Sequence, residues 1–231
     1  MREEPSAAGS FFGRRKGKAL RPGQDRLVRD LLPRLLVTLP EGEATLDPRT
    51  LFAEPCDEVR LEIGFGGGEH LLAAARAEPH VGFIGCEPFV NGMAKLLAIV
   101  EQEGLSNIRL WDDDAAELIA ALAGASVARA YLLFPDPWPK RRQRKRRFLS
   151  DENLRALARI VAPGGALRFA TDIDDYAGWG LARVLRAPDW DWNPRAASDW
   201  REPWPGWPGT RYEAKALREG RPASYLTFER R

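Results

Sequence analysis

Strand-like and helix-like segments alternate regularly between residues 59 and 186, and this alternation restricts the fold more than any other feature of the chain. Short apolar runs predict the strands, and longer amphipathic patterns predict the helices between them. We expect strands at 59–64, 81–87, 107–111, 127–134 and 165–171 and helices at 69–78, 88–103, 114–123, 151–161 and 174–186. Residues 163–165, Pro-Gly-Gly, predict a turn before the fifth strand. This order predicts an α/β fold with a doubly wound parallel sheet and helices on both faces.

The length of 231 residues is enough for one such domain, which we expect to span residues 25–231. Residues 1–24 are rich in Gly, Arg and Lys and predict a flexible basic arm, or alternatively an arm that becomes ordered on RNA. The leucine spacing over residues 25–39 predicts an amphipathic helix, which Pro33 must kink or divide.

The C-terminal part of the chain departs from the alternating pattern. Residues from about 188 to 209 hold five of the eight tryptophans among many prolines, and we expect an insertion that packs over the edge of the sheet. Residues 224–228 alternate as a closing strand should. Thr210 to Glu213 are then expected on the loop that enters the final hairpin.

Composition indicates where in the cell the protein is expected and whether a structural metal is expected. No apolar stretch approaches the roughly 18 residues that cross a membrane, and the N-terminus lacks a hydrophobic signal region, so a cytoplasmic protein is expected. Cys56 and Cys86, together with His70 and His80, form no metal-ligand spacing. We therefore expect reduced thiols and no structural metal.

The turn after the first strand, residues 62–69, contains four glycines, which let a ligand approach the backbone closely. A dinucleotide fingerprint requires Gly-x-Gly-x-x-Gly, but the sixth position counted from Gly64 is Glu69, which weakens the NAD interpretation. Glu87 ends the second strand. Its separation along the chain from the glycine loop is about that at which a carboxylate binds ribose hydroxyls in such folds. A ribose-bearing ligand is expected, and a simple strand-to-helix turn is the alternative.

Carboxylates follow several strands, since Glu62, Glu87 and Asp114 all lie near strand ends. Such a pocket would repel a diphosphate and suit a cation. S-adenosylmethionine carries a sulfonium, an ammonium and a ribose but no phosphate, and this charge pattern favours it over NAD or ATP. For residues 112–114, the alternative is a solvated helix N-terminus, where acidic groups complement the helix dipole.

A proline-rich loop after the fourth strand, residues 134–139, is followed at once by a basic run at 140–147. Three prolines restrict this loop, so Asp136 and Trp138 are expected to be held firmly at the end of the strand. The basic run cannot be buried, and its natural partner is a polyanion such as nucleic acid. A disordered or targeting segment is the alternative, although apolar residues and a helix-start signal on either side favour a folded loop.

The distribution of charge supports this interpretation. The chain has 35 basic and 33 acidic residues, and seven of the basic ones lie in 140–147, so that the remainder has 28 basic against 33 acidic residues. Positive charge is therefore concentrated at one place and should direct a phosphate backbone to one face of the molecule.

Together, these motifs closely resemble the tRNA (guanine-N7-)-methyltransferase family of the bacterial type, over nearly the whole chain. The resemblance is carried by Glu62-Ile63-Gly64-Phe65-Gly66-x-Gly68, Glu87, Asp114-Ala115, Phe134-Pro135-Asp136-Pro137-Trp138-Pro139-Lys140, Thr171-Asp172 and Thr210-Arg211-Tyr212-Glu213. It implies a class I S-adenosylmethionine-dependent methyltransferase fold, which is Rossmann-like with a mostly parallel seven-stranded sheet. It also implies methylation of a guanine in the variable loop of tRNA.

The resemblance also implies roles for particular residues. Asp136 takes the catalytic position. The methyl donor is contacted by Glu62, Gly64, Gly66, Glu87, Asp114 and Asp136. The tRNA substrate is contacted by Lys140, Asp172, Thr210, Arg211, Tyr212 and Glu213. The RNA-contacting basic stretch comprises Arg142, Arg144, Lys145, Arg146 and Arg147. Gln143 stands where many members have His, and Thr-Arg-Tyr-Glu replaces the commoner Thr-Lys-Phe-Glu; both departures concern tRNA preference more than the reaction.

The chemistry requires few groups, because guanine N7 already presents a lone pair and positioning should supply most of the rate. We expect Asp136 to accept hydrogen bonds from guanine N1–H and the exocyclic amine. Trp138 is either a stacking platform for RNA or a packing residue, and Asp172 either contacts tRNA or caps a helix. The alternatives are a catalytically silent RNA-binding subunit and a methyltransferase for another RNA. The sequence leaves open which tRNAs are substrates and whether the chain forms a homo-oligomer.

Overall fold

A seven-stranded sheet forms the centre of the protein, and helices cover both of its faces. The computed structural model describes residues 13–42 and 44–231, so the expectation of flexibility for residues 1–12 of the basic arm lies outside the described residues. The strand order is β3-β2-β1-β4-β5-β7-β6. The strands are β1 Glu58–Ile63, β2 Val81–Cys86, β3 Ile108–Trp111, β4 Val127–Leu133, β5 Val161–Thr171, β6 Trp190–Asp191 and β7 Ser224–Arg230.

The first five strands run parallel, as the alternating pattern predicted, and β7 pairs antiparallel with both β5 and β6. One boundary was predicted wrongly: the Pro-Gly-Gly at 163–165 forms no turn before β5 but lies inside it. The paired residues Val127 and Val161 are followed by the pair Arg129 and Ala166, so four residues of β5 face a single residue of β4. The segment is therefore a bulge, in which the left-handed Gly164 (φ +78°) bends the strand.

The helices lie close to their predicted ranges. They are α1 Pro22–Asp30, α2 Leu32–Leu35, η1 Pro48–Leu51, α3 Glu69–Ala77, α4 Val90–Glu103, α5 Ala115–Ala121, η2 Arg141–Arg146, α6 Asp151–Ile160, α7 Asp174–Val184, α8 Ser198–Arg201 and α9 Arg211–Arg218, where η marks a 3-10 helix. The expected N-terminal helix is divided at Leu31, two residues before Pro33. It begins at residue 22 rather than 25, because Pro22 occupies the first helical position, where its fixed φ is favourable.

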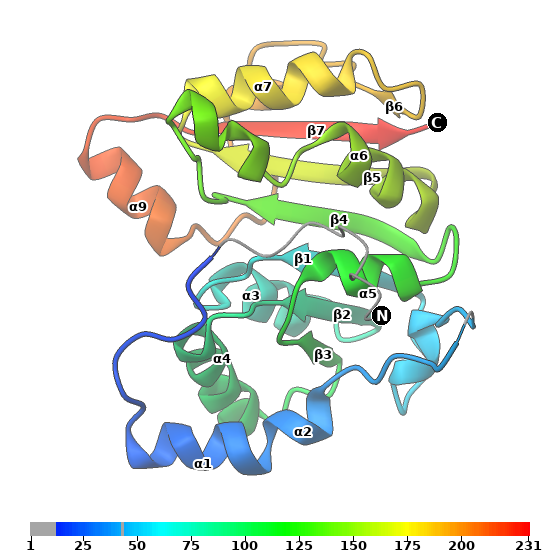
Figure 1. Ribbon diagram of the computed structural model, residues 1–231, viewed down its shortest axis with the longest axis vertical. Coiled ribbons are helices and arrows are strands. Elements are labelled where there is room, and N and C mark those ends of the chain that lie inside the picture. The colour runs from blue at the N-terminus through cyan, green and yellow to red at the C-terminus, as the bar shows by residue number, and fades with distance from the viewer. Residues whose placement is uncertain (1–12, 43) are drawn as a thin grey trace, which may run out of the picture.

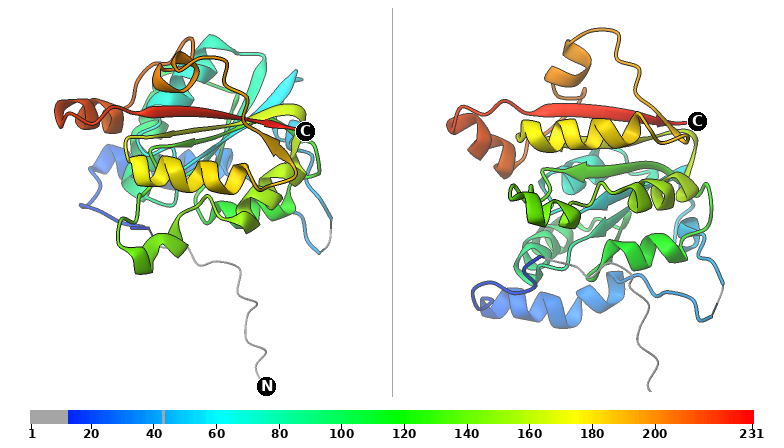
Figure 2. Two further views of the ribbon diagram at one scale, coloured as in Figure 1. Left: turned by 90° about the horizontal axis from the view of Figure 1, so that it is seen from above. Right: turned by 45° about the horizontal axis from the view of Figure 1, so that its top comes forward.

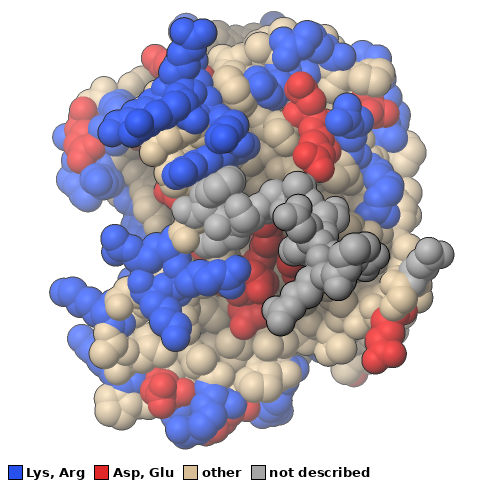
Figure 3. Space-filling view, viewed as in Figure 1, with Lys and Arg blue, Asp and Glu red and all other residues tan. Residues whose placement is uncertain are grey.

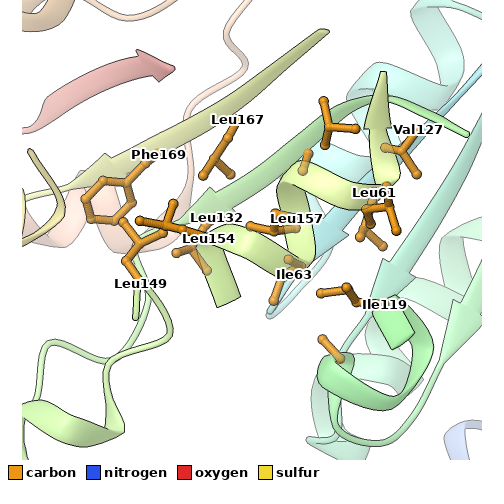
Figure 4. Packing of buried hydrophobic residues seen from close by; sticks show 14 of the residues in the cluster. Leu61, Ile63, Ile119, Val127, Leu132, Leu149, Leu154, Leu157, Leu167 and Phe169 are labelled. Atoms are coloured by element: carbon orange, nitrogen blue, oxygen red, sulfur yellow. The ribbon is translucent and has the colours of Figure 1, made fainter. Parts of the chain in front are cut away.

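Alternate residues of the strands point to opposite faces and form separate cores. On one face, Leu61, Leu132 and Phe169 pack against α5, α6 and α7, and Figure 4 shows this packing around Leu154 and Leu157 of α6. On the other face, α1, α3 and α4 cover β2 and β3. Figure 2 shows α7 and α3 on opposite sides of the sheet.

The last two tryptophans of the tryptophan-rich segment cover the remaining part of the second face. Trp204 packs on Tyr225 of β7, with the ring centroids 5.4 Å apart, and its indole N–H donates to Thr227 Oγ1 (2.9 Å). Trp190, by contrast, belongs to the core on the first face, where its indole N–H donates to the Leu154 carbonyl of α6 (3.0 Å). Trp204 and Trp207 therefore replace a helix as the cover over β4, β5 and β7.

The carboxyl ends of the parallel strands meet at one edge of the sheet, and the strand order reverses between β1 and β4. Such an edge is where doubly wound sheets bind their ligands. Figure 1 shows α9, η2 and residues 13–21 gathered at this edge, although they are far apart in the sequence. Among the residues that the structure describes, no helix is long and apolar enough to cross a membrane.

Candidate active site at the carboxyl edge of the sheet

The glycine loop after β1 brings the backbone close to its neighbours. Gly64, Gly66 and Gly68 have φ values of +74°, +59° and +82°, which residues with a side chain rarely adopt. A Cβ atom on Gly64 would meet nothing within 4 Å, whereas one on Gly66 would lie 3.1 Å from the Tyr212 ring. The loop therefore presents open space at Gly64 and is covered by the start of α9 at Gly66.

Glu87, directly after β2, holds this glycine loop. Its Oε2 accepts a hydrogen bond from Gly66 N–H (2.7 Å), and its Oε1 accepts one from Phe89 N–H (2.9 Å). Burial raises the pKa of the carboxyl group, and the negative charge of Asp136 acts in the same direction, while the two backbone hydrogen bonds oppose the rise. Glu87 and Asp136 follow β2 and β4, and both therefore lie at the carboxyl edge of the sheet.

Glu62 and Asp114 each have a partner within the protein. Glu62 is buried, and its Oε2 lies 2.6 Å from His70 Nδ1. Asp114 is the N-cap of α5 and accepts a hydrogen bond from Ala116 N–H (3.0 Å), as the alternative of a helix N-terminus predicted. Each carboxylate retains further acceptor capacity, so these contacts do not exclude a ligand.

The loop that carries Asp136 has an unusual backbone. Phe134 and Trp138 have φ values of +49° and +42°, and the side chain of Asp136 between them is exposed. The guanidinium of Arg146 lies 4.9 Å from the centre of the Trp138 ring. Trp138 is thus packed against a cation of the basic run, and Asp136 points to solvent at the end of β4.

The basic run does not form one exposed surface. Lys140, Arg141, Arg142 and Lys145 are exposed. The expectation that the whole run is exposed is wrong for Arg147, whose side chain is fully covered and paired with Asp175. Arg144 also pairs with Asp175, at 2.7 Å. An acidic residue in the first turn of α7 is the reason, since a buried cation requires a paired carboxylate.

Thr210 to Glu213 do not lie on a loop that enters a hairpin, as was expected, but begin α9. Thr210 Oγ1 accepts from Glu213 N–H (3.1 Å), and the Glu213 carboxylate accepts from Thr210 N–H (3.2 Å), which forms a capping box. Glu213 is buried and also accepts hydrogen bonds from the indole of Trp207 (2.7 Å) and the hydroxyl of Tyr225. Its carboxylate therefore holds α9 on the sheet, while Tyr212 remains exposed.

Asp172 pairs with Arg221, with Oδ2 2.8 Å from Nε. It does not cap α7, whose N-cap is Ile173. Arg211 lies 3.7 Å from Glu69 and contacts the Tyr212 hydroxyl. These residues fix the position of α9 beside the glycine loop.

The sequence did not reveal two further participants. His70 links Glu62 to the aromatic rings of Tyr131 and Trp207, whose centroids are 4.6 and 5.3 Å away. Part of the basic arm crosses the same edge, where Arg15 pairs with Asp113 and Gly17 N–H donates to Asn91 Oδ1 (2.8 Å). The lysines and arginines of the arm were visible in the sequence, but their partners were not.

The charges at this edge are arranged in zones. Figure 3 shows Asp and Glu atoms near the centre of the view, with Lys and Arg atoms gathered above and below them on the left. Within the described part of the chain, no cluster of three or more metal-ligating side chains occurs. The acidic groups at the strand ends can hold a cationic ligand, and the surrounding Lys and Arg side chains can bind a polyanion.

Known proteins resemble this chain in sequence and in fold. A family model described as a putative methyltransferase matches residues 57–226. In fold, the chain is similar to a solved structure of the 16S rRNA methyltransferase KamB (TM-score 0.57, 20% identity, covering 76% of this chain and 89% of that chain).

Two relatives are similar in sequence over nearly their whole length. A tRNA (guanine-N(7)-)-methyltransferase of Nitrobacter hamburgensis is 54% identical over 97% of this chain and 88% of the relative. The protein of the same description from Brucella anthropi is 55% identical over 97% of this chain and 96% of the relative. At this identity and coverage, the protein belongs to the tRNA (guanine-N7-)-methyltransferase family.

Proposed function

We propose that this protein is an S-adenosylmethionine-dependent enzyme that methylates N7 of a guanine in the variable loop of tRNA. One observation carries the proposal. The exposed carboxylate of Asp136 lies at the end of β4, which pairs with β1 and so is next to the glycine loop, and it directly precedes the exposed cations of the basic run. Family membership supports the same reaction.

The residues at the strand ends fit a cationic donor that carries a ribose. The space at Gly64 is open, and Glu87 uses only part of its acceptor capacity on the backbone, so lone pairs remain for hydroxyl groups. We propose that Glu62, Gly66 and Asp114 complete this pocket, with Glu62 oriented by His70. When bound, S-adenosylmethionine supplies a methyl group on a positively charged sulfur.

Asp136 is the proposed catalytic residue. Guanine N7 is an acceptor with its own lone pair and requires no base to activate it. A carboxylate that accepts hydrogen bonds from N1–H and the exocyclic amine would orient the base. It would also stabilise the positive charge that guanine gains on methylation. The exposure of Asp136 and its fixed loop suit this role.

The proposed tRNA surface surrounds Asp136 at the carboxyl edge of the sheet. Lys140, Arg142 and Lys145 project from the η2 side, and Arg211 and Tyr212 lie on the α9 side. An indirect role is proposed for Thr210, Asp172 and Glu213, whose side chains are bonded within the protein. They would support tRNA binding by holding α9 in place. An A-form helix hides guanine N7 in a deep groove, so the base must be loosened, at a cost that phosphate contacts offset. A tRNA substrate also implies a cytoplasmic location.

The test of the function is methyl transfer from labelled S-adenosylmethionine to unmodified tRNA, followed by nuclease digestion and identification of the labelled nucleoside. We expect the label in N7-methylguanosine. Label in another nucleoside would replace the proposed target but keep the class of enzyme. Absence of label despite tRNA binding would refute the proposal in favour of a silent RNA-binding subunit.

The role of Asp136 has its own test. Asp136→Ala should lower kcat by about 10²- to 10³-fold, because the fixed acceptor for the guanine is lost. Donor affinity, measured by calorimetry, should stay near the wild-type value. Asp136→Asn keeps the shape but presents an amide in place of the carboxylate, and it should also be strongly impaired. Turnover near the wild-type rate in either variant would refute this role.

A further inference from the structure

Two residues with left-handed backbone conformations lie on either side of Asp136. Phe134 (φ +49°) and Trp138 (φ +42°) are not glycines, and such conformations persist only where neighbouring structure holds them. On the β4 side, Phe134 N–H donates to the Ala170 carbonyl (2.8 Å), which anchors that end of the loop to β5. The other end requires an anchor too.

Arg147 supplies that anchor from the far end of the basic run. Its Nε donates to the Pro137 carbonyl (2.8 Å), directly beside Asp136. Its Nη1 donates to the Asp175 carbonyl (3.3 Å), and its Nη2 pairs with the Asp175 carboxylate. One guanidinium thus joins the proline-rich loop to the first turn of α7.

The environment of Arg147 is unlike that of an RNA-binding cation. Its side chain is fully covered, and its guanidinium lies 4.8 Å from the ring centre of Tyr176 and 5.1 Å from that of Trp179. The hydrogen bond from Arg147 lowers the pKa of Asp175, which keeps this carboxylate ionised at neutral pH. A covered, fully engaged cation can reach no phosphate, whereas Arg142 in the same run is exposed.

We propose that Arg147 and Asp175 are positioning residues, which fasten the Pro137 carbonyl to α7 and thereby hold Asp136 in place for the reaction. The basic run then has two parts with different roles. The exposed cations bind RNA, and Arg147 fixes the catalytic loop. The effect on kcat rests on the proposed function of Asp136, whereas the effect on the loop itself does not.

Kinetics of three variants separate positioning from RNA binding. Arg147→Lys keeps the charge but loses the planar guanidinium, whose several N–H groups join Pro137 to Asp175. Asp175→Asn removes the ion pair. Both should lower kcat by about 10- to 100-fold, because small displacements of a catalytic group have effects of this size. Their KM for tRNA, and the salt dependence of tRNA binding, should remain as in the wild type. The exposed control Arg142→Gln should instead raise KM and reduce the salt slope by about one charge.

Asp175→Asn is the sharpest of these variants, because it removes a negative charge. A lower kcat in this variant cannot come from a lost phosphate contact. Since Asp175 also pairs with Arg144 (2.7 Å), Arg144→Gln tests this second pair separately: it leaves the Arg147 contacts in place and should not speed amide exchange at residues 134–140. Asp175 is half exposed, so Asp175→Asn decides the matter if Arg147→Lys fails to fold.

Hydrogen exchange measures the loop without reference to activity. In the free protein, Asp175→Asn should speed amide exchange at residues 134–140 relative to the wild type, while exchange in β1 and β2 stays unchanged. The proposal is overturned if exchange and kcat both match the wild type, or if Arg147→Lys raises KM and lowers the salt slope as Arg142→Gln does. An inactive wild type with faster loop exchange in Asp175→Asn would refute the function but support the anchor.

Discussion

Gly92, in the first turn of α4, offers a quantitative test of how the glycine loop is held. A Cβ atom at this position would lie 2.2 Å from the carbonyl oxygen of Gly66, whereas ordinary contact begins at 3.4 Å. Gly92→Ala must therefore displace the glycine loop, or the start of α4, by about 1 Å. Both are backbone, so no flexible side chain can move aside.

The expected cost follows from this overlap. Overpacking of this kind costs about 1–3 kcal/mol, and alanine recovers up to about 1 kcal/mol through its higher helix propensity. The difference is centred on a net loss of about 1.5 kcal/mol, which corresponds to a fall in Tm of about 3–6 °C for a domain of this size. The displacement also strains the hydrogen bond from Gly66 N–H to Glu87, so donor affinity should fall by at least about tenfold.

Gly178→Ala is the matched control. Gly178 lies inside α7, and a Cβ atom there would meet nothing within 4 Å. This variant should therefore gain up to about 1 kcal/mol of stability with donor affinity unchanged. Thermal unfolding and calorimetric titration of the donor measure both quantities. Wild-type Tm and donor affinity in Gly92→Ala would refute the close approach of α4 to the glycine loop.

Two further predictions concern buried carboxylates. Burial raises the pKa of Glu87, and a cationic donor favours the ionised form of this carboxyl group. Donor affinity should therefore fall with decreasing pH, beginning above the ordinary glutamate range. In that pH range, donor binding should release a proton. Titrations in buffers of different ionisation heat measure this release, which Glu87→Gln should abolish. An affinity that stays constant until the pH reaches the ordinary glutamate range would contradict the prediction. Glu213→Gln weakens the hydrogen bonds that hold Trp207 and Tyr225 to α9 and should lower stability by about 1–3 kcal/mol, measured by urea unfolding. An unchanged urea midpoint would show that this carboxylate does not hold α9 in place.

Sequence patterns were sufficient for the sheet and for the edge that carries the site. The first five strands and the helices between them lie close to their predicted ranges, because periodicity and the Gly and Pro signals are local properties of the chain. The bulge at Pro163-Gly164-Gly165 was read as a turn, because its glycines signal a bend in either case. Only the pairing of β5 with β4 distinguishes the two.

The contacts of the site depended on the tertiary structure. Charge and spacing identified Glu87 and Asp136 as candidates, since acidic residues at strand ends meet at one edge in any doubly wound sheet. The burial of Arg147 was not predictable in this way, because it depends on Asp175, which lies 28 residues further along the chain. The sequence thus determined which strand-end residues reach the carboxyl edge. Long-range packing alone decided which of them are exposed to a substrate and which hold the loops in place.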